Sequence, residues 1–169
     1  PDTVNRFFEE WKDQKKENER LKAELAEARV KAMMGDAIEF PFKSIGAITG
    51  GDEKGITFKI KAIPKKIPHA DVDELIKVAT EFSKNDDVVA LLASDLGGVK
   101  IVVAAGERAQ KRGVNAGAIV REMSKLVGGG GGGKPGIAQG GGTEVEMIEE
   151  ALKRGVEMVR EMVENQINK

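Results

Sequence analysis

The stretch "DVVALLASDLGGVKIVVAAG", residues 87–106, decides the fold. Its two apolar runs, 87–94 and 99–106, are nearly continuous, which is typical of strands that are buried on both faces. Gly97 and Gly98 lie between the runs and favour a tight turn. We therefore expect two buried strands that pair antiparallel.

The sequence before this pair predicts one further strand and one helix. Residues 55–64, "GITFKIKAIP", alternate between two faces and predict a strand that Pro64 ends. Residues 69–85 place apolar side chains at helical spacing, with Asp71 near the start of this amphipathic helix. The apolar stretch 37–51 carries two glycine turns.

Two helices are predicted after the central pair of strands. Residues 115–127 present an apolar face behind an N-cap at Asn115, and residues 143–169 form a long helix capped by Thr143. Gly155 in the middle of that helix costs roughly 1 kcal/mol relative to Ala. Its presence therefore indicates close packing against another element.

Residues 1–34 contain no Pro or Gly after the first residue, and Gly35 suits a helix end. The flanks carry eight acids and eight bases, so the outer face is solvated. The remaining positions keep a spacing of 3–4, which forms the a/d seam of a coiled coil: Val4, Phe7, Trp11, Gln14, Asn18, Leu21, Leu25, Ala28 and Ala32. We favour a helix–helix interface here, with the orientation of the two helices left open. There are two alternatives: the helix folds back on its own domain, or it breaks into two helices at Gln14 and Asn18.

These elements predict an α/β fold. A long N-terminal helix, coiled-coil-like, precedes a small mixed sheet that is flanked by helices. We expect a helical segment at residues 1–35 and a globular domain at 36–169, with a glycine-rich loop at 128–142. The start at Pro1, directly in helical sequence, suggests a piece cut from a longer protein.

The composition excludes several classes of site. There are no cysteines, so disulfides and thiolate metal sites are excluded, and His69 is the single histidine. A zinc site or a histidine-based triad within this chain is not expected, and we assign His69 a structural role at a helix start. No apolar run reaches membrane-spanning length and no signal peptide is visible, so we expect no membrane partner and a cytoplasmic location.

The net charge of −1 hides an uneven distribution. Residues 43–66 carry six Lys against two acids, a net of +4, and residues 100–134 carry seven bases against two acids, a net of +5. Residues 67–99 carry seven acids against two bases, a net of −5. Segregated basic charge is what a polyanion partner requires, although charge alone fits an ordinary solvated surface better.

The glycine stretch "LVGGGGGGKPGIAQGGGTE", residues 126–144, does not fit the common phosphate-binding motifs. A P-loop needs Ser or Thr after its Lys, whereas Pro135 follows Lys134. A dinucleotide fingerprint joins a strand to a helix, whereas this stretch joins two predicted helices. Two uses remain: close approach of another backbone, and free N–H groups that attract phosphate together with Lys134.

The segment "VNAGAIVREMSKLVGGGGGGKPGIAQGGG", residues 114–142, resembles the DHHA1 domain that closes alanyl-tRNA synthetases. The resemblance covers about residues 36–169, and a charged helix before the domain is also usual in that family. The basic residue before Pro is often Arg, and a Met-like residue often precedes Ala-Gln, so Lys134 and Ile137 depart mildly. The matching positions are Val114, Asn115, Ala116, Gly117, Gly128–Gly133, Lys134, Pro135, Ala138, Gln139 and Gly140–Gly142.

This resemblance implies the C-terminal dimerisation and tRNA-binding region of an alanine–tRNA ligase, with tRNA(Ala) and a second copy of the chain as partners. The family's full enzyme uses ATP and magnesium to attach alanine to tRNA(Ala), and a zinc-dependent site removes mischarged Ser or Gly. None of those catalytic or zinc-binding motifs occurs in this sequence. We therefore expect no catalytic residue, metal or cofactor in this chain.

Three alternatives stay open. The domain also occurs in free-standing editing proteins and in DHH-type phosphoesterases, and the absence of His near Lys134 argues against the latter. A purely structural dimeriser is the third.

The resemblance also implies roles for named residues. Basic residues are expected to contact the tRNA backbone: Lys134, Arg121, Lys125, Lys111 and Arg112, with Lys65 and Lys66 secondary. Apolar residues of the first helix are expected to form the dimer interface, with a contribution from the last helix: Val4, Phe7, Phe8, Trp11, Leu21 and Leu25, then Met158 and Met162.

Overall fold

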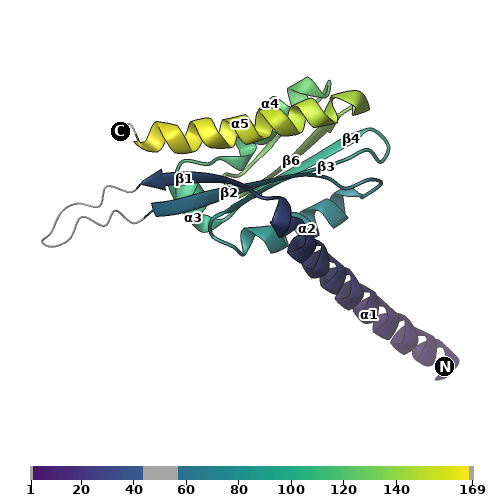
Figure 1. Ribbon diagram of the computed structural model, residues 1–169. Coiled ribbons are helices and arrows are strands. Elements are labelled where there is room, and N and C mark those ends of the chain that lie inside the picture. Colours follow the sequence, from purple (N-terminus) through teal and green to yellow (C-terminus); the bar gives the residue numbers. More distant parts are fainter. Residues whose placement is uncertain (1, 44–56, 168–169) are drawn as a thin grey trace, which may run out of the picture.

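The computed structural model describes residues 2–43 and 57–167 (Figure 1). The predicted glycine turns near residues 46–51 and the first residues of the strand predicted at 55–64 lie outside this part. In chain order the elements are α1 (Asp2–Met33), the 3₁₀ turn η1 (Met34–Asp36), β1 (Ile38–Lys43), β2 (Thr57–Lys66), α2 (Val72–Ser83), β3 (Val88–Ser94), β4 (Val99–Ala105), α3 (Glu107–Lys111), α4 (Ala116–Leu126), β5 (Gly130–Gly133), β6 (Ile137–Gly142), the 3₁₀ turn η2 (Val145–Met147) and α5 (Ile148–Ile167).

Six strands form one mixed sheet in the order β1-β2-β3-β4-β6-β5. The two apolar runs are its central strands β3 and β4, which pair antiparallel with Leu91 opposite Val103, as their sequence predicts. Among the described strands only β2 and β3 are parallel, and α2 makes the crossover between them. The predicted α/β class, with a long first helix and a mixed sheet flanked by helices, is confirmed.

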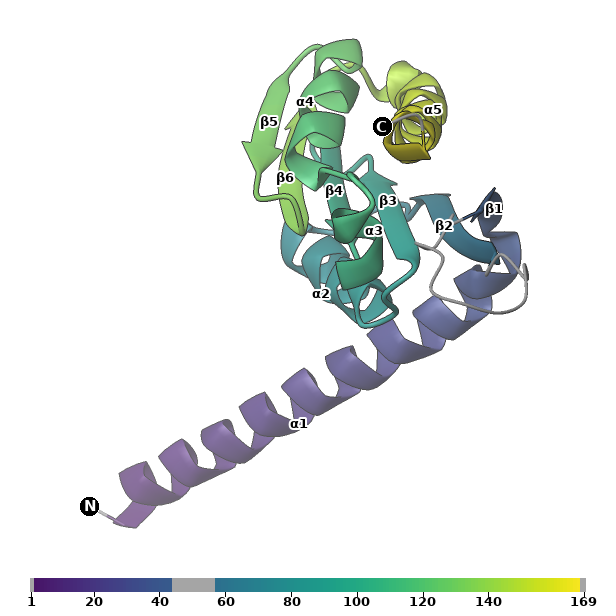
Figure 2. The same ribbon diagram turned by 90° about the vertical axis from the view of Figure 1, so that its left-hand side faces the viewer.

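Helices cover both faces of the sheet (Figure 2). In β3, Val89 and Leu91 belong to the core that α4 and α5 complete, whereas Ala90 and Leu92 belong to the core beneath α2. This alternation explains the continuous apolar run, because both faces of the strand are buried. Gly155 lies against β3 and α4 as predicted: a Cβ there would stand 2.7 Å from Leu91 Cδ2 and 2.8 Å from Met123 Sδ.

The strand expected to end at Pro64 continues through it to Lys66. The N–H of Lys61 donates to the carbonyl of Asp87, just before β3, and that of Ile67 to the carbonyl of Ala93, so the alternate position 64 points to the other side of the strand. The register of β1 reaches only Ala62, so no ladder hydrogen bond is needed at Pro64. A proline without an N–H group is therefore tolerated at this position.

The glycine-rich segment is a β-hairpin and not the loop predicted at 128–142. Four glycines form the edge strand β5, and β6 pairs with β5 on one side and with β4 on the other. Glycine is a poor strand former, but close packing beneath α4 requires it at Gly131 of β5 and at Gly140 of β6. The hairpin thus extends the sheet by two strands.

The predicted helix cap at Asn115 is present and the one at Thr143 is not, while Asp71, expected near the start of its helix, also caps it. Asp71 accepts a hydrogen bond from the N–H of Glu74, and Asn115 accepts one from the N–H of Ala118. The last helix starts later than expected, because η2 separates Thr143 from α5. The N–H of Thr143 instead donates to the carbonyl of Val127, which closes the hairpin against the end of α4.

Candidate dimerisation helix and nucleic-acid interface

The N-terminal part of α1 projects from the domain (Figure 1). The apolar side chains predicted for the dimer interface are all exposed on this helix: Val4, Phe7, Phe8, Trp11, Leu21 and Leu25. Phe7 remains 64% exposed and Trp11 49% exposed, although each has a large apolar surface. A row of exposed aromatic and aliphatic side chains along one helix is typical of a protein–protein contact.

The last turns of α1 are anchored on α2. Ala26 and Val30 are buried there, and the guanidinium of Arg29 donates to Glu74. Lys77 Nζ lies 3.0 Å from Glu19 Oε2, and this ammonium holds the pKa of the Glu19 carboxyl below its ordinary value. One end of the helix therefore does fold onto its own domain, which was one of the alternatives, while the predicted seam remains exposed.

The expected contribution of α5 to a dimer interface is not supported at Met158. Its side chain is only 8% exposed and belongs to the core between α5 and the sheet, and Met162 packs against that core. In the sequence, these two methionines broaden the apolar face of the helix. The structure gives the reason, because α5 crosses the sheet and buries a broad face against it. We assign both to the domain's own packing.

The hairpin glycines fall into two groups by what surrounds them. A Cβ at Gly140 would stand 2.3 Å from Ser124 Oγ, and one at Gly131 would stand 2.7 Å from Val120 Cγ1. These glycines therefore let α4 pack directly on the hairpin backbone. A Cβ at Gly130 or Gly132, in contrast, would meet no atom within 4 Å.

Gly130, Gly132, Ile137 and Gln139 define what we call the open hairpin face. They alternate with the positions that α4 covers, and Ile137 and Gln139 are exposed. Packing alone does not explain glycine at 130 and 132. The sequence did not reveal this face, because a run of identical glycines hides the two-residue alternation of a strand.

The turn between β5 and β6 (Figure 2), which contains Lys134, is hydrogen-bonded to the start of α4. The N–H of Ala116 donates to the carbonyl of Pro135, and that of Ala105 to the carbonyl of Gly136. A Cβ at Gly136 would contact the side chain of Gln110, the neighbour of Lys111. Lys134, Lys111 and Arg112 therefore come from one corner of the molecule.

Arg121 and Lys125 lie on the exposed side of α4, beyond that corner. Lys125 Nζ is 2.6 Å from Glu122 Oε1, and this contact lowers the pKa of the Glu122 carboxyl. Lys111 pairs in the same way with Glu107 at 2.6 Å. Within the described residues, no ion pair is seen for Lys134 or Arg121, so these two cations are the most available to an anionic partner.

Lys65 and Lys66 are not brought together with the other basic residues. They end β2, which β3 and β4 separate from the hairpin. Lys65 Nζ lies 2.5 Å from Asp36 Oδ2, and Lys66 Nζ lies 2.9 Å from Asp95 Oδ2. Both ammonium groups already have carboxylate partners, which weakens their secondary role at a nucleic-acid surface.

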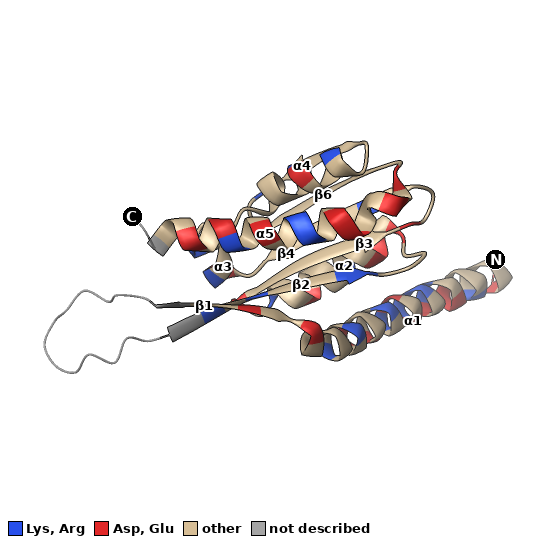
Figure 3. Ribbon diagram, turned by 45° about the horizontal axis from the view of Figure 1, so that its top comes forward, with Lys and Arg blue, Asp and Glu red and all other residues tan. Residues whose placement is uncertain are grey.

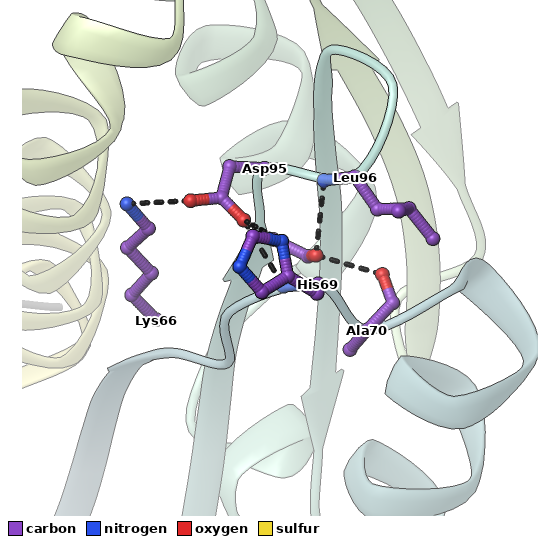
Figure 4. Close-up of polar contacts among 6 residues, drawn as sticks. Lys66, His69, Ala70, Asp95 and Leu96 are labelled. Atoms are coloured by element: carbon purple, nitrogen blue, oxygen red, sulfur yellow. Dashed lines mark hydrogen bonds and ion pairs between the residues drawn. The ribbon is translucent and has the colours of Figure 1, made fainter.

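His69 has a structural position beside Asp95 (Figure 4). Its φ of 58° places it in a left-handed turn before α2, and its N–H donates to Asp95 Oδ1 at 3.0 Å. This hydrogen bond, followed by the contact with Lys66, lowers the pKa of Asp95 from 3.8 to about 2. The imidazole itself is 82% exposed, so the residue shapes the turn through its backbone.

A groove of about 450 Å³ lies where α1 leaves α2. Leu25 and Ile76 line it together with charged side chains of both helices, so it continues the exposed seam of α1. In residues 2–43 and 57–167, no group of three or more His, Asp or Glu side chains is placed to hold a metal ion. None of the helices described in those ranges has the length and hydropathy that crossing a membrane requires.

The sequence matches the family of the DHHA1 domain over residues 58–164. It is 56% identical over 160 residues to the alanine–tRNA ligase of Methanosarcina mazei and 52% identical over 161 residues to that of Methanosarcina acetivorans. Both alignments cover 95% of this chain, which spans only 15% and 16% of those relatives. The fold is similar to the crystal structure of the C-Ala domain from Aquifex aeolicus alanyl-tRNA synthetase, with a TM-score of 0.52 and 28% identity over 62% of this chain and 91% of that one.

Proposed function

The chain belongs to the DHHA1 domain family, and from this membership we propose that it is the C-terminal dimerisation and tRNA-binding region of an alanine–tRNA ligase. The first helix joins two copies, and the surface around α4 and the glycine hairpin holds tRNA(Ala). The similarity to two alanine–tRNA ligases over 95% of the chain supports this parent. The chain contributes binding and no catalytic group.

The proposal of tRNA binding rests on one observation: Lys134 lies at the corner formed by the hairpin turn and the α3–α4 junction. The hydrogen bond from Ala116 to Pro135 fixes the hairpin turn there, so the ammonium is presented from a rigid base. The adjacent open hairpin face has no side chains at Gly130 and Gly132. A ribose-phosphate backbone can therefore approach β5 closely while Lys134, at the hairpin turn, neutralises a phosphate. Arg121 lies on α4, on the other face of the hairpin, and can contact a phosphate of a strand that continues around the β5 edge.

Titration of the 169-residue chain with fluorescent tRNA(Ala) tests this surface. Each phosphate contact should reduce the slope of log K against log salt concentration by roughly 0.7–0.9 when it is removed. We expect the double variant Lys134→Ala/Arg121→Ala to bind tRNA at least about tenfold more weakly, with a shallower slope.

Lys12→Ala/Lys16→Ala is the matched control, because both lysines are exposed on α1, away from the hairpin and from α3. It removes two positive charges without touching the proposed surface, and its affinity should stay near that of the wild type. Equal weak binding of tRNA and of an unrelated acidic polymer would instead favour a purely structural dimeriser.

Dimerisation rests on the exposed row of α1. Burying several aromatic and leucine side chains at about 25 cal/mol per Å² supplies a driving force for association. Sedimentation equilibrium should find a dimer at micromolar concentration, and Trp11→Asp/Leu21→Asp should be monomeric. A wild-type monomer under these conditions would contradict this part of the proposal.

The chemistry of the whole enzyme would take place elsewhere. Aminoacylation with ATP and magnesium, and zinc-dependent removal of Ser or Gly from tRNA(Ala), need ligand sets that the residues of this chain do not fit. The sequence has no cysteine and a single histidine, and no carboxylate cluster suited to a metal occurs among the described residues. We place the enzyme in the cytoplasm, where tRNA is charged.

A further inference from the structure

The a and d positions of the exposed seam define the heptad position of every other residue in α1. The side chains at positions a and d are all exposed, and Leu25 also lines the groove between α1 and α2 beside the buried Ala26. The a positions are Val4, Trp11, Asn18, Leu25 and Ala32, and the d positions are Phe7, Gln14, Leu21 and Ala28. The flanking e positions are then Phe8, Lys15, Lys22 and Arg29, and the g positions are Thr3, Glu10, Glu17, Glu24 and Lys31.

The two flanks of the seam carry opposite charge. Apart from Phe8 every e position is basic, and three consecutive g positions are Glu. In a parallel coiled coil, g of one helix faces e of the other, so Glu10 meets Lys15 and Glu17 meets Lys22 of the second copy. In an antiparallel pair, e faces e and g faces g, which would place like charges together.

The seam itself agrees with a parallel pair of two strands. Asn18 would meet Asn18 of the second copy, and a single Asn at an a position sets register and oligomer state. The apolar layers do not discriminate, because an antiparallel pair would match Trp11 with Leu21 and Phe7 with Leu25. Orientation is therefore decided by the charged flanks.

The structure leaves these flanks available to a second helix. The ion pairs of Glu10 and Glu17 are made with Arg6 and Arg20 of the same helix at 3.3 Å, on exposed side chains. Such surface pairs exchange easily because each contributes little. Arg29 is held by Glu74 of α2, so the third possible pair, between Glu24 and Arg29, carries no weight.

We propose that two copies of α1 associate as a parallel, two-stranded coiled coil, with Asn18 opposite Asn18 and Glu10 and Glu17 paired with Lys15 and Lys22 of the other copy. This inference rests on the dimer of the proposed function and adds its orientation and register. Both globular domains then lie at the same end of the coil, on opposite sides of it.

The absence of cysteine in the sequence permits a direct test by single substitutions in the full 169-residue chain. Asn18→Cys should form a covalent dimer on mild oxidation, because facing a positions meet the Cα separation of a disulfide, about 4.4–6.8 Å. A mixture of Gln14→Cys and Asn18→Cys should give no mixed disulfide, whereas an antiparallel pair would join these two positions.

A nitroxide on Asp2→Cys gives an independent distance. Parallel helices hold the two labels at one level, within about 20 Å across the pair. Antiparallel helices in the same seam place Asp2 opposite residue 30, so the labels would be about 42 Å apart at 1.5 Å per residue.

Charge reversal should weaken a parallel dimer but not an antiparallel one. Glu10→Lys/Glu17→Lys should weaken the dimer at least about tenfold in a parallel coil, because four attractive contacts become repulsive. Addition of the Lys15→Glu/Lys22→Glu chain should restore a mixed dimer. An antiparallel dimer would keep or gain affinity, because the new positive charge at position 10 would face Glu24 of the other copy.

The outcomes also separate this inference from the proposed function. A monomeric wild-type chain overturns both the dimer and its orientation. A stable dimer that resists cross-linking through Asn18→Cys and shows the long label distance overturns the orientation alone.

Discussion

At the scale of single residues, the glycines of the hairpin have different surroundings, although the sequence does not distinguish them. Gly131 and Gly140 lie beneath α4, where any side chain would collide with Val120 or Ser124. Gly130 and Gly132 face open space on the other side. Substitutions by the same small side chain should therefore have opposite effects on stability.

Gly140→Ala should destabilise the domain by about 1–3 kcal/mol, because the added methyl group overpacks a tight contact. Gly132→Ala should be neutral or stabilise by up to about 1 kcal/mol, because the unfolded chain loses freedom and nothing is displaced. Urea unfolding followed by circular dichroism measures both variants. Equal destabilisation by the two would contradict this division of the glycines.

Asp95 makes the domain sensitive to acid. Its carboxyl stays ionised in the folded chain down to about pH 2, whereas its ordinary pKa is 3.8. A lowered folded pKa stabilises the fold above the unfolded value, and this contribution is lost as pH falls from about 4 towards 2.

Asp95→Asn should therefore lower the melting temperature at pH 7, because the ion pair with Lys66 is lost. The difference from the wild type should shrink as the pH falls through about 4 and vanish near about pH 2. Thermal melts across this range provide the measurement. A difference that is constant with pH would show that Asp95 acts through packing and not through its charge.

At the scale of elements, α1 is one continuous helix with two roles. Its last turns are buried against α2 through Ala26 and Val30, and its earlier turns expose Phe7 and Trp11. The first part should contribute to association and the last part to the stability of the domain.

Val30→Ala should lower the free energy of unfolding by about 1–2 kcal/mol at any protein concentration, because a buried contact is lost. Trp11→Asp should leave the unfolding of dilute protein unchanged and remove the dependence of the midpoint on concentration, which dimerisation produces. Chemical unfolding at two protein concentrations separates the effects. A concentration-dependent midpoint in Trp11→Asp would place the contact elsewhere.

How far each element could be predicted depends on its side chains. The central strands were predicted because both faces are buried and the apolar residues are continuous. The strands β1 and β5–β6 were not, because Pro41 and the glycines carry turn signals that packing overrides. Among the proposed site residues, Lys134 was chosen from its motif, whereas the open hairpin face could be defined only from the register of β5 with β6.

At the scale of the whole molecule, the exposed part of α1 and the helix α4 lie on different sides of the sheet (Figure 3). The open hairpin face is on the same face of the sheet as α2, because Gln139 pairs with Val102. The exposed half of α1 leaves the domain beside α2, and α4 lies across the opposite face of the sheet. Dimer formation should therefore leave the proposed contacts of Arg121 and Lys134 with tRNA undisturbed.

Trp11→Asp/Leu21→Asp should bind tRNA(Ala) with an affinity per site near that of the wild type. Lys134→Ala/Arg121→Ala should dimerise normally, because neither residue is near α1. Sedimentation with labelled tRNA should give one tRNA per chain in both the monomer and the dimer. Loss of tRNA binding on monomerisation would show that the two copies share one site.

The edge strand β5 has a consequence for the colloidal behaviour of the protein. An exposed strand edge is a template for intermolecular pairing, and most proteins protect it with charged or bulky side chains. The four glycines of β5 provide no such side chains, and a glycine-rich strand leaves the register of an incoming strand unspecified, which permits alternative pairings. The low strand propensity of glycine is then the property of this edge that opposes self-assembly.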